Sequence, residues 1–106
     1  MQPEEVLVAL HSAFAIATRA QLRNDALPSA WSQWVILPVP GYIEASSYGP
    51  VPLREIDWIE LDPIEQRPIG RLVPAQIIDH THALLQQFAA AGIVVQVMEA
   101  KIRLTF

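Results

Sequence analysis

Apolar residues recur at helical spacing near the start of the chain. This spacing predicts a helix over residues 4–23. Its apolar stripe consists of Val6, Leu10, Ala13, Phe14 and Ala17. Pro3 stands where a helix-initiating proline is favoured, and Glu4 and Glu5 follow in the first turn, where they complement the helix dipole. Val8 and Ile16 lie off the stripe, so we expect the helix to be covered on more than one side.

A second helical pattern spans residues 74–91, beginning at Pro74 and ending before Gly92. After it, residues 93–98 and 101–106 are predicted to form a β-hairpin, and residues 101–106 alternate between polar and apolar, as a half-buried strand does. Glu99-Ala100 lacks the Gly or Asn of a tight primed turn, so we expect a loop longer than two residues. The residues expected in the core are Phe14, Leu84, Leu85, Phe88, Ile102 and Leu104.

The middle of the chain, residues 24–73, is extended in character, because most of the nine prolines of the whole chain lie between residues 28 and 74 and disallow long helices there. Strands are predicted over residues 31–37, 42–45 and 53–61, and loops over 46–50 and 64–73. The strand at 53–61 mixes charged and apolar side chains on both faces. That mixture favours an edge position in a sheet, where charge discourages unwanted strand addition.

The predicted order of elements is α-β-β-(β)-α-β-β within one domain spanning residues 1–106. No βαβ repeat is present, and the connections between strands are short. The pattern therefore predicts an α+β fold: an antiparallel or mixed sheet of about four to five strands with two helices packed on it.

Composition narrows the classes of function. Hydrophobic residues make up 52% of the chain and charged residues 17%, a low charged fraction that leaves apolar surface for a partner or a homodimer. There is no cysteine, which excludes disulfides, thiolate metal ligands and a cysteine nucleophile. The net charge of −4 with scattered cations argues against nucleic acid as a partner. The acidic start and the lack of a long apolar run predict a soluble cytoplasmic protein without membrane contact.

Negative charge is concentrated between residues 44 and 65. This acidic window holds six carboxylates and one cation, Arg54, about −5 in total. A local acidic field on a small apolar body favours a basic protein as partner, and tyrosines are suitable interface anchors. The expected partner-binding residues are Glu55, Asp57, Glu60, Asp62, Tyr42 and Tyr48. The three tryptophans, Trp31, Trp34 and Trp58, lie in strand-like runs and are expected in the core.

Catalytic and cofactor motifs are weak. His80 and His82 form a His-x-His pattern, but on a helix positions two apart do not share a face, so no metal site is expected. No serine, including Ser46 and Ser47, stands in a nucleophile-elbow pattern, and no glycine-rich phosphate loop is present. We therefore expect neither an enzyme nor a cofactor.

These observations favour a small acidic protein that binds and neutralises or regulates a cationic protein. In size and acidity the chain resembles bacterial immunity proteins, which block a cognate toxin, and phage-encoded inhibitors; the resemblance covers no motif. Two alternatives stand beside this hypothesis. One is a homo-oligomeric structural subunit, suggested by the apolar excess, and the other is a small metal-dependent or hydrolytic enzyme using His80 and His82.

Overall fold

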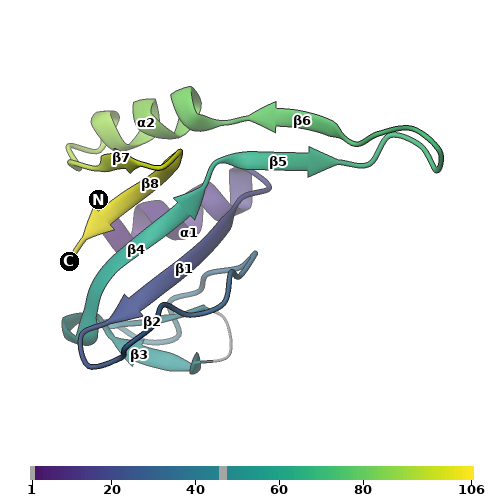
Figure 1. Cartoon of the computed structure of the whole chain (residues 1–106). Helices are drawn as coiled ribbons and strands as arrows, with labels where there is room; N and C mark the ends of the chain where they lie inside the picture. Colours follow the sequence, from purple (N-terminus) through teal and green to yellow (C-terminus); the bar gives the residue numbers. More distant parts are fainter. Residues whose placement is uncertain (1, 46–47) are drawn as a thin grey trace.

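The computed structural model describes residues 2–45 and 48–106 and shows a single α+β domain, as the sequence predicts. Its main sheet has four antiparallel strands in the order β1-β4-β8-β7. Their bounds are β1 Ala17–Leu22, β4 Ile56–Asp62, β8 Lys101–Thr105 and β7 Gln96–Met98. Helix α1 (Pro3–Ala13) lies behind one face of this sheet, and in the described part of the chain no helix covers the other face (Figure 1).

Two smaller two-stranded sheets extend the domain. β2 (Tyr42–Glu44) pairs with β3 (Pro50–Pro52), and the short 3-10 helix η2 (Leu53–Glu55) leads from β3 into β4. β5 (Ile64–Arg67) pairs with β6 (Gln76–Asp79) to form an arm that projects from the body of the molecule (Figure 1). Helix α2 (Thr81–Ala90) follows the arm directly and returns the chain to the main sheet.

The core lies on the inner face of the main sheet and includes buried residues from α1, α2, β2, β3 and the segment around Val35. Leu84, Phe88, Ile102 and Leu104 are fully buried, as the sequence predicts. Phe14 and Leu85 are only partly buried and pack against the core from outside. The other buried apolar residues are Val6, Leu7, Leu10, Ile16, Val35, Ile43, Val51, Ile56, Ile59 and Leu61.

The first predicted helix is too long. α1 ends at Ala13, Phe14 adopts an extended conformation, and the chain continues as strand β1. Thr18 is buried, the other five residues of β1 are partly buried, and the strand pairs antiparallel with β4. Neither Gly nor Pro marks this break, and the alanines of the segment fit helix and strand alike, so helical spacing was an incomplete guide.

The second predicted helix also starts too early. Residues 76–79 form β6, and Pro74 lies in the turn of the arm rather than at a helix start. A helix that started at Pro74 would have no polar N-cap residue. The actual start has Asp79, whose carboxylate accepts hydrogen bonds from the Thr81 N–H at 2.9 Å and from the Thr81 hydroxyl. These bonds satisfy donors at the beginning of α2. The predicted loop at 64–73 was likewise wrong, since residues 64–67 are strand β5.

Strand β4 occupies the interior of the main sheet, between β1 and β8, so the predicted edge position is wrong. Its charged side chains are accommodated because Glu60 is paired with arginines from both neighbouring strands. Of the predicted strand at 31–37, the structure retains two isolated bridges, Thr18 to Ser32 and Ile36 to Glu44. The short strand predicted at 42–45 is confirmed as β2.

The terminal hairpin is confirmed, but its turn has two residues, because Met98 pairs directly with Lys101. Glu99 and Ala100 both adopt positive φ, +51° and +63°. Positive φ at both positions is the left-handed geometry of a primed turn. The turn contains neither Gly nor Asn, the residues that favour this geometry, and for that reason the sequence suggested a longer loop.

Candidate protein-docking site

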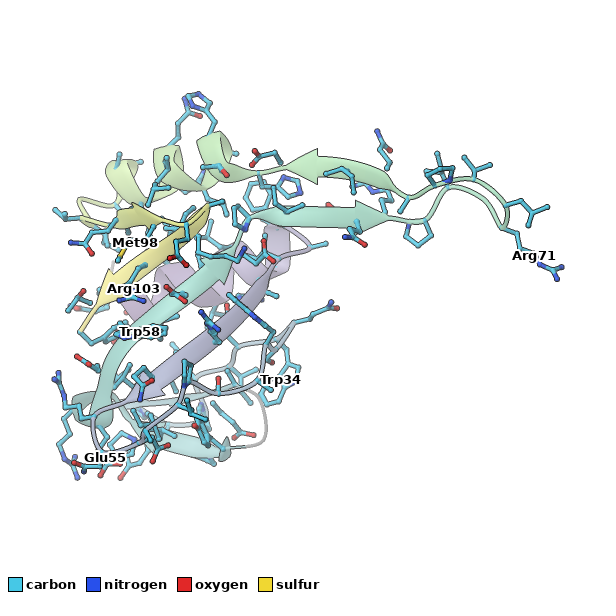
Figure 2. All side chains as sticks on the ribbon, in the orientation of Figure 1. Trp34, Glu55, Trp58, Arg71, Met98 and Arg103 are labelled. Atoms are coloured by element: carbon cyan, nitrogen blue, oxygen red, sulfur yellow. The ribbon has the colours of Figure 1, made fainter. Side chains whose placement is uncertain are left out.

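At the end of the molecule where sheet β2–β3 and η2 lie, carboxylates and tyrosines come from five segments of the chain (Figure 1). These segments are linked by the Arg23–Asp57 pair, by the Tyr48–Asp25 bond and by the groove that places Glu4 and Glu5 beside residues 37–41. We call this end the acidic pole. It comprises Glu4, Glu5, Asp25, Tyr42, Glu44, Tyr48, Glu55 and Asp57. Sheet β2–β3 and η2 form its frame, and Figure 2 shows Glu55 at this end, away from the arm. Four of the six residues expected to bind a partner lie here.

Arg23 holds the frame of the acidic pole together. Its backbone N–H donates to the Glu55 carbonyl at 2.9 Å, and its Nε donates to the Arg54 carbonyl at 2.9 Å. Its guanidinium lies 3.7 Å from an Asp57 carboxylate oxygen. Both side chains of that pair are about half exposed, so the pair contributes little stability and leaves Asp57 accessible.

Tyr48 is held by a side-chain hydrogen bond, and Tyr42 is positioned by the β2–β3 ladder. The Tyr48 hydroxyl donates to the Asp25 carboxylate at 3.1 Å. Burial, followed by the hydrogen bond and negative charge of Asp25, raises the pKa of Tyr48 above its ordinary value. Tyr42 lies opposite Pro52 in the β2–β3 ladder, next to Gly41, whose carbonyl accepts from the Leu53 N–H at 3.0 Å.

An open groove of about 420 Å³ enters the acidic pole beside Gly41. One wall carries Glu4 and Glu5 from the first turn of α1, and the other is formed by residues 37–41. The lining of the groove combines prolines with two carboxylates, a chemistry that suits the methylene stem and the charge of a long cationic side chain. The sequence analysis assigned Glu4 and Glu5 only to the helix start, because only the fold brings them to this end.

Charge is unevenly distributed over the molecule. The acidic pole has six carboxylates, and the arginines of its frame are Arg23 and Arg54, which leaves about four negative charges. The whole chain has a net charge of −4. The remaining surface is therefore close to neutral. Exposed Ile36 and Val39 lie beside the carboxylates and give the pole an apolar component.

Glu60 does not belong to the acidic pole. Its carboxylate is 4% exposed and is bound by Arg19 at 2.7 and 2.9 Å and by Arg103 at 2.8 and 3.0 Å. Burial by itself raises the pKa of this carboxyl, but the hydrogen bonds and charges of the two arginines outweigh that effect and hold it below its usual value. Glu60 is thus the centre of a structural ion-pair cluster on the uncovered face of the sheet.

Asp62 and Glu65 are also separated from the acidic pole. Asp62 accepts from the Ile64 N–H at 3.0 Å and lies 3.9 Å from Lys101. Glu65, on the arm, is bound by His80 at 2.8 Å and Arg67 at 3.0 Å, and these two partners lower its pKa. The acidic window of the sequence therefore divides into an accessible part at one end of the molecule and a part whose carboxylates are paired with basic side chains, most of which are distant in sequence.

The tryptophans are not core residues, contrary to the prediction. Trp31 and Trp34 are exposed, and Trp58 lies on the uncovered face of the main sheet with Arg103 (Figure 2). The Arg19 guanidinium lies 4.7 Å from the centre of the Trp31 ring, and that of Arg103 lies 4.0 Å from the centre of the Trp58 ring. These cation–π contacts hold the arginines over Glu60.

The residues considered for chemistry are used in local structure. His80 bonds Glu65 and packs against the Phe14 ring, whereas His82 is exposed on α2. Burial lowers the pKa of His11, whose ring bonds the Thr18 hydroxyl. Among residues 2–45 and 48–106, no three His, Cys, Asp or Glu side chains are grouped so that they could hold a metal ion. Ser46 and Ser47 lie outside the described residues.

The fold and the acidic pole define a small α+β protein with one polarised, partly apolar surface. In the described part of the chain no helix has the length and apolar character needed to cross a membrane. The chain belongs to a family of unknown function, DUF6678, whose pattern matches residues 8–105. The chain itself has no match among the curated proteins or among the solved structures.

Proposed function

We propose that this protein is a non-catalytic, cytoplasmic binding protein that neutralises or regulates a basic protein through the acidic pole. The observation that carries the proposal is the confinement of about four net negative charges to one end of an otherwise neutral molecule. Such a field attracts a cationic partner and orients it before contact. Tyr42 and Tyr48 would then anchor it, since aromatic side chains contribute strongly to protein interfaces.

The groove of the acidic pole specifies the kind of contact. A lysine or arginine of the partner inserts between residues 37–41 and the pair Glu4 and Glu5, and a basic rim faces Glu55 and Asp57. Glu60 supports this surface only indirectly, by fixing the main sheet. We therefore expect charge reversal at the pole to act on association rate, because exposed rim charges mainly steer encounter.

The test uses two variants that change the net charge equally. Glu5→Lys with Glu55→Lys alters the acidic pole, where both side chains are exposed. The control combines Glu99→Lys with Gln86→Lys and Gln87→Lys, which are exposed elsewhere. Wild type and both variants are immobilised and exposed to soluble extract of the organism that encodes the chain. We expect a basic protein that wild type and control capture and the pole variant loses.

Surface plasmon resonance with that captured protein then gives the rates. The pole variant should associate more slowly, and raising salt from about 0.1 M to 1 M should slow wild type as well, since the Debye length falls from about 10 Å to about 3 Å. If both variants lose binding equally, only net charge matters and the docking site is wrong. If neither loses it, the acidic pole is not the binding surface. Titrating the chain into an activity assay of the partner tests whether binding inhibits it.

A further inference from the structure

The main sheet is closed at one margin and open at the other. Along β1, the chain segment around Ser32 adds backbone hydrogen bonds: Thr18 and Ser32 exchange two bonds of 2.7 Å, and the Ser29 N–H donates to the Ala20 carbonyl at 2.8 Å. At the opposite margin, β7 is the last strand (Figure 1). Within the described part of the chain, no strand pairs with its outer side.

Apart from the short length of β7, the open margin carries none of the features that normally protect an edge strand. Residues 93–98 read Ile-Val-Val-Gln-Val-Met, without charge and without proline. Val94 is 90% exposed, Val97 55% and Met98 41%. Soluble proteins usually place lysine, proline or a bulge at such a position, because an unpaired apolar strand recruits another strand. An unprotected edge of this kind therefore indicates an interface.

The tight turn determines which backbone groups are free. Met98 and Lys101 close a two-residue hairpin and form a hydrogen-bonded pair, so the next residue, Val97, directs its N–H and C=O away from β8. Within β7 the outer side therefore offers one donor and one acceptor, at Val97. Val94 and Val95 precede β7, and if a pairing partner extends the strand through them, the same alternation directs the backbone groups of Val95 outward.

We propose that β7 pairs antiparallel with β7 of a second copy of this chain, joining two four-stranded sheets into one continuous sheet. The pairing is centred on Gln96, which lies opposite Gln96 of the other copy. Val97 of each copy then exchanges two backbone hydrogen bonds with Val95 of the other, and Met98 lies opposite Val94.

A second copy fits this edge because the strand is complementary to itself in that register. Each exposed apolar side chain meets another apolar side chain, and the two Gln96 amides face one another on the same side of the sheet. No charged residue enters the ladder, so no charge is left buried without a partner. A two-fold axis uses the same strand on both copies and closes the assembly at a dimer. Figure 1 shows sheet β2–β3 at another end of the molecule, so both acidic poles stay free.

The oligomeric state of Val97→Pro tests the proposal. Proline removes the outward N–H of an edge strand and none of the hydrogen bonds between β7 and β8. Wild type should show twice the chain mass of 11.8 kDa by sedimentation equilibrium at high concentration. The variant should dissociate about thirtyfold more readily, because symmetry removes the same donor from both strands. Val97→Thr, which keeps the backbone donor, is the matched control and should stay close to wild type.

A second measurement needs no variant. In a mixture of isotope-labelled and unlabelled wild type, isotope-filtered NMR should give contacts between Val94 methyls of one copy and the Met98 methyl of the other. Exchange of the Val97 amide hydrogen should slow as protein concentration rises. A wild type that stays monomeric, or a dimer without these contacts, overturns the proposal. A dimer that survives Val97→Pro but is broken by Ile69→Lys places the interface on the β5–β6 arm and also overturns it.

Discussion

Replacing Glu60 by glutamine tests whether the cluster on the uncovered sheet face stabilises the fold. The substitution keeps the size and shape of the side chain and removes only its charge and two acceptor sites. In wild type Arg103 donates two hydrogen bonds to Oε2. Arg19 donates one to Oε1 and places a second guanidinium nitrogen 2.7 Å from the same oxygen. The oxygen of the glutamine amide can accept hydrogen bonds from one arginine. Its NH₂ group is itself a donor, so it cannot accept from the N–H groups of the other arginine.

The expected loss of stability in Glu60→Gln follows from how deeply the ion pairs of Glu60 are buried. Removing one member of a fully buried ion pair costs about 3–5 kcal/mol. Here the side chains of Arg19 and Arg103 are 32% and 25% exposed, so water compensates part of the lost charge. We expect a loss of about 2–3 kcal/mol in the free energy of unfolding at pH 7. For a domain of this size that lowers the urea midpoint by about 2 M.

The pH dependence provides a sharper test. Because the folded pKa of Glu60 lies below its unfolded value, the carboxylate contributes stability above the unfolded pKa of about 4.3. That contribution is lost as the pH falls through the folded pKa. The difference between wild type and Glu60→Gln should therefore be full at pH 7 and shrink at more acidic pH. Glu65 and Asp79 also have lowered pKa values, but both are present in both proteins, so their effects cancel in the difference.

The assay is urea unfolding followed by tryptophan fluorescence and circular dichroism across the acid range. Glu55→Gln is the matched control, because Glu55 is exposed at the acidic pole and its removal should change stability by less than about 0.5 kcal/mol. Equal stability of Glu60→Gln and wild type at pH 7 would refute the reasoning. So would a difference between them that stays constant as the pH falls below the unfolded pKa.

Three further predictions concern the turn, the core and the arm. Replacing Glu99-Ala100 by Asn-Gly should raise Tm by about 4–8 °C, roughly 1 kcal/mol, because both positions have positive φ; calorimetry showing no rise would contradict this. Phe88→Ala should cost about 3–5 kcal/mol in urea unfolding and Leu85→Ala clearly less, since only Phe88 is fully buried; equal losses would contradict it. Replacing residues 68–75 by Asn-Gly should leave cooperative unfolding intact, because these residues are exposed; loss of a single transition would show that the tip supports the core.

Hydrophobic periodicity predicted the fold correctly where a segment fits only one period, either the helical period of about 3.6 residues or the strand period of two. The α2 segment carrying Leu84 and Phe88 and the β8 segment carrying Ile102 and Leu104 were correctly assigned for this reason. The errors occur where both periods fit. Around Thr18, alanines are compatible with helix and strand, and the decision comes from pairing with β4, a contact across about forty residues of sequence. Such long-range pairing is not encoded in local periodicity.

The docking site shows the same limit in terms of charge. A window of sequence sums charges that lie close along the chain, whereas a partner experiences charges that lie close in space. Glu60 lies between Asp57 and Asp62 in the acidic window of the sequence, yet arginines from the two neighbouring strands neutralise its charge. A central strand can hold such a carboxylate only because the residues opposite it are cationic, and strand order was beyond the sequence.

The fold buries Glu60, and it also brings to the acidic pole carboxylates that lie outside the acidic window of the sequence. Glu4 and Glu5 enter through the packing of α1 beside residues 37–41, and Asp25 enters through its bond to Tyr48. The resulting pole has nearly the whole net charge of the protein although its members span more than fifty residues of sequence. If charge in linear sequence were what mattered, reversing Glu60 and reversing Glu55 would weaken partner binding alike. If the pole is the docking site, a change at Glu55 alters binding in a stable protein, and a change at Glu60 alters stability.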